Sequence, residues 1–313
     1  MKLLFIIDPP DSLKAYKDSS VAMMRAAQAR HHEVFVSRQE NLHWSKHRVA
    51  TAALRISTTD NDDDWYRAHE ELEQPLEAFD AVLMRKDPPF DLEYVATTWL
   101  LSAAARHGAR IFNAPDAVRD HNEKLAIAEF ARFTAPTLVT REPARIQAFI
   151  DEHGDTVVKR LDVMGGENVF RVRSDDPNRN VIVEIMAQGG ARTVMAQRFI
   201  PEISQGDKRV LLIDGVVVPY CLARIPKPGE TRGNLAAGAR GVAQPLSARH
   251  KEIAGALGPV LAGRNLLLVG LDVIGDWLTE VNVTSPTCFR EIQDQTGFDV
   301  AGMFLEALER KAA

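Results

Sequence analysis

Short apolar runs alternate with amphipathic stretches over the first 120 residues, and this alternation constrains the fold more than any other feature of the sequence. The runs that read as strands are KLLFII at 2–7, EVFVS at 33–37, DAVLMR at 80–85 and ARIFN at 109–113. Helices are predicted between them at 19–32, with Ser19 or Ser20 as the N-cap, and at 92–106. Strands that alternate with helices are typical of a small parallel α/β unit.

Ligands of a parallel sheet bind at the carboxyl ends of its strands. Asp8, Arg85 and Asn113 follow three of the predicted strands, so we expect them near a binding site.

The pattern changes near residues 120–122, where we expect a domain boundary. A helix is predicted at 123–133 with Asn122 as its cap, and Thr140 is expected to cap another helix through Phe149. The chain then becomes rich in strands, and Asp214-Gly215 between two apolar runs predicts a hairpin. We therefore expect an α/β domain at 1–122 and a mostly antiparallel α+β part at 123–313.

Composition limits the class of function. The chain has 313 residues, a formal charge of −5 and two cysteines, Cys221 and Cys288, with a sequence pI near 6.0. A general nucleic-acid or anionic-membrane binder would carry excess positive charge. The apolar run MKLLFII is too short for a secretory signal, and no window approaches the ~18 apolar residues of a membrane span. We expect a cytoplasmic enzyme.

The segment 157–172 combines a lysine with a glycine pair. Lys159 lies on a predicted strand, and Gly165-Gly166 connects it to the next strand. Paired glycines let backbone N–H groups turn toward an anion, and a nearby lysine adds a positive charge. The alternative is an ordinary glycine hairpin with a surface lysine.

The hairpin at 270–283 carries hard oxygen donors. Glu280 and Asn282 alternate with Val281 and Val283, so both donors lie on one strand face. If the turn has an odd number of residues, Asp272 shares that face, and three oxygen ligands suit magnesium bound to phosphates. An even turn would place Asp272 on the opposite face, and the remaining alternative is a solvated hairpin.

Basic residues gather around the long glycine-rich stretch 226–241, which has no apolar periodicity and predicts a mobile lid. Several arginines beside a carboxylate metal site suggest a clamp for a phosphoryl group, although any one of them could be structural. The basic residues are Lys208, Arg209, Arg224, Arg232 and Arg240.

Ordered strings along nearly the whole chain resemble the bacterial glutathione synthetase family of ATP-grasp ligases. The strings are MRKDPPFD at 84–91, NEKL at 122–125, VVKRLDVMGG at 157–166, GDKRVL at 206–211, PYCLARIPKPGETRGNLAAGARG at 219–241 and GLDVIGDWLTEVNVTSPTCFREI at 270–292.

The resemblance implies a fold, a reaction and an assembly. The fold would be an α/β domain followed by an ATP-grasp fold, with a lid subdomain at about 123–200 and a catalytic core at about 201–313. The reaction would join γ-glutamylcysteine to glycine through an acyl phosphate, with ATP as co-substrate and Mg²⁺, or Mn²⁺ in its place. A homo-oligomer, usually a tetramer, is also implied.

The resemblance further implies roles for individual residues. Those expected to contact ATP are Lys124, Lys159, Gly165, Gly166, Gln197, Phe199, Ile200 and Asp207. The implied magnesium ligands are Asp272, Glu280 and Asn282. The groups around the acyl phosphate are expected to be Arg209, Arg224, Arg232 and Asn234. The peptide substrate is expected to contact Arg85, Asp18, Ser285 and Thr287.

Two positions depart from the family pattern. Val163 and Ala239 stand where the family usually has glycine, and each could stiffen its loop by removing access to positive φ. Two other functions compete: a related carboxylate–amine ligase with another acceptor, and a nucleotide-binding regulator without catalysis. A regulator would be expected to lack a metal ligand or a lid arginine, and the sequence retains all of them.

Overall fold

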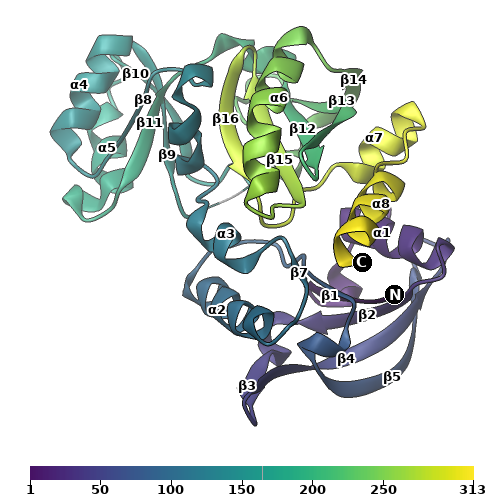
Figure 1. Cartoon of the computed structure of the whole chain (residues 1–313). Helices are drawn as coiled ribbons and strands as arrows, with labels where there is room; N and C mark the ends of the chain where they lie inside the picture. The colour runs from purple at the N-terminus through teal and green to yellow at the C-terminus, as the bar shows by residue number, and fades with distance from the viewer. Residues whose placement is uncertain (164) are drawn as a thin grey trace.

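The computed structural model describes residues 1–163 and 165–313 and contains three β-sheets (Figure 1). The first sheet has the order β3-β4-β2-β1-β6-β7, with β5 also paired to β4. Its strands are β1 (Lys2–Ile7), β2 (Glu33–Arg38), β3 (His43–Ser45), β4 (Arg48–Thr58), β5 (Tyr66–Pro75), β6 (Ala81–Met84) and β7 (Ile111–Phe112). In the described part of the chain, no helix is long and apolar enough to cross a membrane.

The expectation of a purely parallel first sheet is wrong, because the sheet is mixed. Strands β1, β2, β6 and β7 pair in parallel, whereas β4 pairs antiparallel with β2, β3 and β5. The sequence YRAHEELEQP of β5 is mostly exposed and shows no apolar alternation. Its pairing is satisfied by backbone hydrogen bonds to β4, so apolar periodicity could not reveal it.

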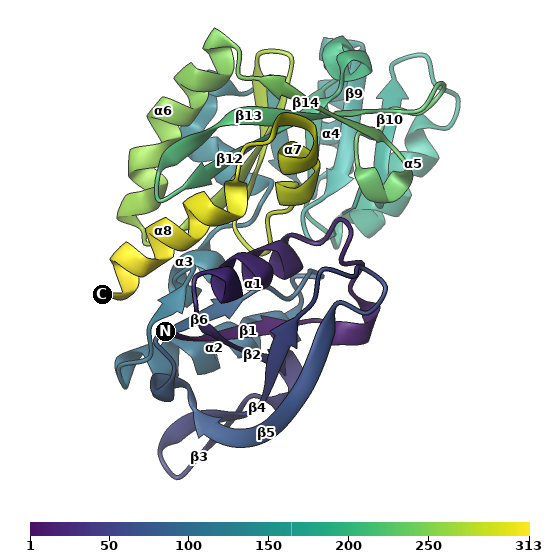
Figure 2. The same cartoon turned by 90° about the vertical axis from the view of Figure 1, so that its right-hand side faces the viewer.

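Helices cover both faces of this sheet. Leu4 and Ile6 of β1 pack in the cluster that includes Tyr94 and Leu101 of α2 (Leu92–Arg106), and the alternate residues pack against α1 (Ser19–Ala29). Helix α3 (Pro115–Asp120) follows β7. The C-terminal helix α8 (Val300–Ala312) packs along α1, between α1 and the third sheet (Figure 2).

The N-cap of α1 is Asp18 and not Ser19 or Ser20. The Asp18 carboxylate accepts a hydrogen bond from Val21 N at 2.9 Å. Both serines are used elsewhere: Ser19 Oγ accepts from Phe289 N, and Ser20 Oγ accepts from the Arg85 guanidinium.

The second sheet is antiparallel, in the order β10-β9-β11-β8. Its elements are β8 (Thr137–Thr140), α4 (Pro143–His153), β9 (Asp155–Arg160), β10 (Val169–Arg173), α5 (Arg179–Ala187) and β11 (Val194–Arg198). Thr140 ends a strand, so the prediction that it caps a helix is wrong; the residue at the start of α4 is Glu142. The helix predicted at 123–133 is the 3₁₀ helix Leu125–Phe133, interrupted at Phe130. Its N-cap is Lys124 and not Asn122 as predicted, although Asn122 Oδ1 accepts hydrogen bonds from the amides of Lys124 and Leu125.

The third sheet is also antiparallel, in the order β14-β13-β12-β15-β16. Its elements are β12 (Asp207–Ile213), β13 (Val216–Ile225), β14 (Arg240–Pro245), α6 (Ala248–Gly263), β15 (Leu268–Ile274), β16 (Trp277–Asn282) and α7 (Phe289–Thr296). The predicted hairpin is confirmed, since Ile213 pairs with Val216 across Asp214 and Gly215, both at positive φ. The remaining short 3₁₀ turns are Pro10–Ser12, Gln39–Asn41, Leu76–Ala78, Gln188–Gly190, Pro201–Gln205 and Leu235–Ala237.

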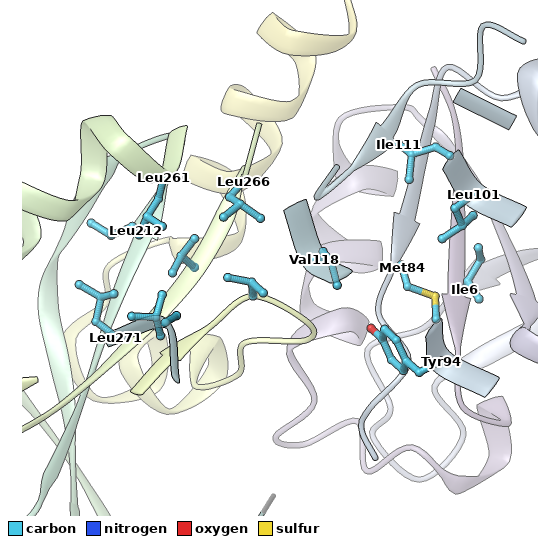
Figure 3. Close-up of a cluster of buried hydrophobic side chains, with 14 of the residues drawn as sticks. Ile6, Met84, Tyr94, Leu101, Ile111, Val118, Leu212, Leu261, Leu266 and Leu271 are labelled. Carbon is cyan, nitrogen blue, oxygen red and sulfur yellow. The ribbon is translucent and has the colours of Figure 1, made fainter. Parts of the chain in front are cut away.

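One apolar core joins the first and third sheets. It extends from Ile6 and Leu101 past Val118 to Leu266 and Leu271 (Figure 3). The two sheets therefore pack as one unit, and a site between them has walls of fixed relative position.

Asn113 connects these sheets and does not line the large cavity described below. Its Nδ2 donates to Leu268 O and Val283 O, both at 2.8 Å, and its Oδ1 accepts from Leu268 N at 2.9 Å. The side chain is buried, so all three bonds are shielded from water. Asn113 thus connects β7 to β15 and to the segment after β16.

We predict that Asn113→Ala lowers the free energy of unfolding by about 1–3 kcal/mol. The substitution leaves the buried amide of Leu268 and the carbonyl groups of Leu268 and Val283 without their Asn113 partner. Urea unfolding followed by circular dichroism measures the loss. Asn178→Ala is the matched control, since Asn178 is exposed and makes no side-chain cap bond. An equal, small effect of both substitutions would contradict the connecting role of Asn113.

Candidate functional site

A cavity of about 620 Å³ lies where the three sheets meet. Its walls come from the loop 12–18, the loop 86–88, strands of the second and third sheets, and the loops 231–235 and 284–288. The residues expected to contact ATP, metal, acyl phosphate or peptide all line this cavity except Arg85. Asn113, expected near a binding site, and Lys208 and Arg240 of the predicted basic cluster do not line it either. Met164, in the glycine loop, lies outside the described residues.

The register of the third sheet places charged residues on one face. Asp207 pairs with Arg224, and Arg209 pairs with Asp272. Asp272 also pairs with Glu280. Residues directly opposite one another in antiparallel strands have side chains on the same face. The alternate residues, such as Val210 and Leu271, belong to the core with α6.

The alignment of Asp272 with Glu280 depends on a β-bulge. The turn between β15 and β16 is Gly275-Asp276, an even number of residues, so regular pairing would place Asp272 opposite Thr279. The register shifts by one residue beside Asp272, which leaves Thr279 as the extra residue and restores the pair. The expectation that an even turn breaks the site is therefore wrong, because a bulge reverses its effect.

Two buried arginines surround Asp272. Arg209 Nε and Nη2 donate to its carboxylate at 2.6 and 3.1 Å, and Arg224 Nη2 lies 2.9 Å from Oδ2. Burial alone would raise the pKa of Asp272, but the two guanidinium groups outweigh burial and hold its pKa below the usual range. This carboxylate stays charged.

Asp207 lies on the same face, but its carboxylate is less fully paired than that of Asp272. One of its oxygens contacts Arg224 Nη2 at 2.5 Å, while Oδ1 is buried without a hydrogen-bond partner among the described residues. Burial raises the pKa of Asp207 to about 7, against the opposing effect of Arg224. A buried polar atom without a partner is costly, so Oδ1 is available to a donor on a ligand.

Two buried lysines converge on Glu280 from the other wall. Lys124 Nζ is 3.8 Å and Lys159 Nζ is 3.7 Å from Glu280 Oε1. Burial lowers the pKa of Lys159, and Glu280 counters part of that effect. Lys124 also donates to Val163 O at 2.6 Å, which connects it to the glycine loop. Two ammonium groups in a cavity suit a polyanion such as a nucleotide phosphate.

The two glycine-bearing loops touch above these charges. Gly165 and Gly166 have positive φ. A Cβ on Gly166 would lie 2.6 Å from Asn234 Oδ1, and a Cβ on Gly233 would lie 2.7 Å from Asp207 Cβ. Only glycine permits these approaches. Val163 and Ala239 are not among the described residues with positive φ, so this backbone does not need glycine at either position.

The end of the cavity near β11 is partly apolar. Val157, Val169, Phe199, Ile200 and Ile274 line it. Arg171 lies over the Phe199 ring at 3.7 Å, and Gln197 donates to Thr137 Oγ1. An apolar end of a cavity with polar groups at its edge suits a nucleobase.

The opposite end contains the residues expected to contact a peptide. Ser285 Oγ donates to Asp87 Oδ1 at 2.6 Å, and Thr287 and Asp18 also line the cavity. Arg85 lies behind this wall. Its Nη2 donates to Pro286 O at 2.9 Å, so in this structure it supports the loop without lining the cavity.

Several polar lining residues were not singled out from the sequence as site residues. Asp8 was noted only because it follows a strand. Most of the others lie within strings that carry the family resemblance or beside residues expected in the site, but nothing local in the sequence assigned them a role, and the fold brings them to the cavity. These residues are Lys14, Lys17, Lys86, Asp87, Glu123, Arg198, Cys288 and Glu291.

The donors expected for a metal have suitable chemistry. Glu280 and Asn282 offer carboxylate and amide oxygens to the cavity, as Mg²⁺ prefers. Asn282 donates through Nδ2 to Gly270 O, so its Oδ1 is the end left for a cation. Both oxygens of Asp272 contact arginines. In the described residues, no three His, Cys, Asp or Glu side chains form a ready metal cluster.

Comparisons with known proteins cover the whole chain. The family model "prokaryotic glutathione synthetase, N-terminal domain" matches residues 1–119, and "prokaryotic glutathione synthetase, ATP-grasp domain" matches 123–297. A glutathione synthetase of Ralstonia nicotianae is 58% identical over 100% of this chain and 96% of its own length. The Nitrosomonas europaea glutathione synthetase is 57% identical over 100% and 99%.

More distant solved structures share the fold. D-cycloserine synthetase DcsG matches with a TM-score of 0.69 at 17% identity, over 99% of this chain and 100% of its own. The ATP-grasp ligase PsnB, solved with Mg and ADP, matches with a TM-score of 0.61 at 20% identity, over 99% and 98%.

Proposed function

The chain belongs to the prokaryotic glutathione synthetase family, and on that premise we propose that it joins γ-glutamylcysteine to glycine while ATP becomes ADP and phosphate. The main support for the proposal is the charged face of the third sheet, which lies opposite two buried lysines. Arg209, Asp272 and Glu280 lie in one row across three strands, and Lys124 and Lys159 converge on Glu280. Such a site can neutralise a transferring phosphoryl group.

The reaction has two steps. A cysteinyl carboxylate oxygen attacks the γ-phosphorus of ATP, the bond to the bridging oxygen breaks, and ADP leaves. The nitrogen of glycine then attacks the acyl carbon, phosphate leaves, and the nitrogen loses its proton. Activation is needed because a carboxylate is a poor electrophile, and water must be excluded because it would hydrolyse the acyl phosphate.

The residues divide this work. We assign Lys124, Lys159 and the Gly165-Gly166 loop to the phosphates of ATP, and Gln197, Phe199, Ile200 and Asp207 to the rest of the nucleotide. Arg209 and Arg224 would stabilise the acyl phosphate, with Arg232 and Asn234 added from the lid. Asp18, Ser285 and Thr287 would contact the peptide, and Arg85 would position the last two.

ATP-grasp ligases use ATP with magnesium. We propose that Glu280 and Asn282 hold Mg²⁺, or Mn²⁺ in its place, with Asp272 as a third ligand if it gives up an arginine contact. The ion would neutralise charge on the phosphate oxygens. The free cysteines Cys221 and Cys288 are both buried, which supports a reducing location such as the cytoplasm.

We predict that Glu280→Gln lowers turnover by about 10²–10³-fold, as when one charge-stabilising group of an active site is removed, and has little effect on stability. ADP release with γ-glutamylcysteine, with and without glycine, is the measurement. Glu184→Gln is the matched control on the exposed side of α5. Near-normal turnover of Glu280→Gln would contradict the metal assignment.

The same assay in the wild-type chain separates the competing functions. Turnover only with another amine would indicate a related ligase, and nucleotide binding without turnover would indicate a regulator. Glycine-dependent release of ADP supports the proposed reaction.

We propose that the chain divides at 122/123 into an N-terminal domain and an ATP-grasp domain, with a lid subdomain at about 123–200 and a catalytic core at about 201–313. We also propose that the loop 226–241 is a mobile lid over the catalytic core. The contact of Gly166 with Arg232 and Asn234 supports closure of both loops over the same cavity. Lids of this kind exclude water and complete a site when substrate binds.

Trypsin should therefore cut after Arg232 rapidly in the free protein and slowly with ATP and γ-glutamylcysteine. Cleavage is followed by mass spectrometry, with cleavage after the exposed Lys251 on α6 as the internal reference. Equal protection of both sites, or of neither, would show that 226–241 is a fixed surface element.

We propose a homo-oligomer, a tetramer by resemblance, in which α2 contacts a second copy. Leu92 is 79% and Trp99 57% exposed, on a helical stripe that also contains Ala96 and Ala103. An antiparallel copy of α2 would place Trp99 over the small alanines of the stripe. A large aromatic side chain opposite small ones makes the stripe complementary to itself in shape, as a two-fold interface requires.

Trp99→Asp should lower the oligomeric mass, measured by light scattering after size-exclusion chromatography, because a carboxylate would be buried at the centre of the stripe. Trp44→Asp is the matched control, since Trp44 is 56% exposed on β3, away from α2. An unchanged mass for Trp99→Asp, or the same loss for both variants, would exclude α2 as the interface.

A further inference from the structure

The peptide end of the cavity holds two kinds of charge that the mechanism above does not use. Lys14 and Lys17 line it from the loop before α1, and Glu291 lines it from the first turn of α7. Glu291 Oε2 is buried and has no hydrogen-bond partner among the described residues. A polar atom left in this state needs a partner from outside the chain.

The protein holds these charges in place through their neighbours. Ser19 Oγ accepts from Phe289 N at 3.2 Å, which fastens the start of α1 to the start of α7. Lys17 lies two residues before Ser19, and Glu291 lies two residues after Phe289. Arg85 adds a second connection, because it donates to both Ser20 Oγ and Pro286 O.

The other carboxylates at this end already have partners. Asp18 accepts from the backbone of α1, Asp87 accepts from Ser285, and Asp8 is 2.8 Å from Lys86 Nζ. Burial raises the pKa of Glu291, and the charge of Lys17 opposes that effect. Glu291 is thus the carboxylate here whose buried oxygen is left for a ligand.

A γ-linked glutamyl group has the chemistry that fits this pair of charges. Its peptide bond uses the side-chain carboxylate, so an ammonium and a carboxylate remain free on the same α-carbon. An α-linked glutamyl group has no free α-carboxylate beside its ammonium. Charge-assisted hydrogen bonds to both groups would distinguish the two linkages.

We propose that Glu291 and Lys17 form the subsite for the α-amino acid end of the γ-glutamyl group, with Glu291 on the ammonium and Lys17 on the carboxylate. This inference rests on the proposed function and makes both residues determinants of peptide specificity. Lys14 lies on the same loop and adds a second positive charge to this end of the cavity.

The test combines substrate analogues with enzyme variants, so that each substrate group can be matched to the residue that contacts it. Glutarylcysteine lacks only the ammonium, and 4-aminobutyrylcysteine lacks only the α-carboxylate. In the wild type each should have a kcat/KM about 10–100-fold below that of γ-glutamylcysteine, the effect of one lost charge-assisted bond. In Glu291→Gln the penalty for glutarylcysteine should nearly vanish, while the penalty for 4-aminobutyrylcysteine remains. Lys17→Gln should show the reverse.

Further readouts separate specificity from structure. KM for ATP and for glycine, and the unfolding midpoint, should stay unchanged in both variants. Glu306→Gln, on the exposed side of α8, is the matched control and should keep both penalties. Unchanged peptide ratios in Glu291→Gln and Lys17→Gln would overturn the subsite.

The two proposals fail in different ways. If the wild type makes no tripeptide from γ-glutamylcysteine, the proposed function is wrong. Calorimetric binding of the three peptides to wild type and variants then gives the same comparison without turnover. Equal affinities for γ-glutamylcysteine and glutarylcysteine in the wild type would reject Glu291 as the ammonium partner.

Discussion

The buried carboxylate of Asp272 is the group on which the charge balance of the site depends. It is 2% exposed and contacts both Arg209 and Arg224. Two guanidinium groups on a buried sheet face would be very costly without a countercharge. Asp272 supplies it and also orients both arginines toward the cavity. The same carboxylate is a proposed metal ligand, so cation binding and arginine position would be coupled through one side chain.

Rigid and adjustable parts of the site come from different kinds of structure. The charged residues lie on β12, β13, β15 and β16, whose other face packs on α6 in a core shared with the first sheet. The groups proposed to control access lie on loops, where Gly166 and Gly233 permit close backbone approach. This division suits a reaction in which phosphate must meet preorganised charge while water is excluded.

Most elements with strong periodicity were predictable, and the failures have identifiable causes. Strand β1 and helix α2 have the expected bounds because their apolar spacing matches a buried strand and a half-buried helix. Strand β5 was missed because its side chains are mostly exposed. The cap of α1 was assigned one or two residues late, because a serine and an aspartate can each accept from the first amides and only the backbone direction selects between them.

The sequence by itself determined which residues can share a strand face, because the period of two is set by covalent geometry. Glu280 and Asn282 lie together for that reason, and so do Asp207 and Arg209. Only the tertiary structure decided which strands are neighbours and in what register: Thr279 forms a bulge, and Asp272 therefore faces Glu280. The tertiary structure also brought the loop with Lys17 to the helix with Glu291. The hydrogen bond from Phe289 N to Ser19 Oγ that joins these segments connects residues 270 positions apart in the sequence. Such contacts depend on how whole sheets pack, and no local pattern encodes them.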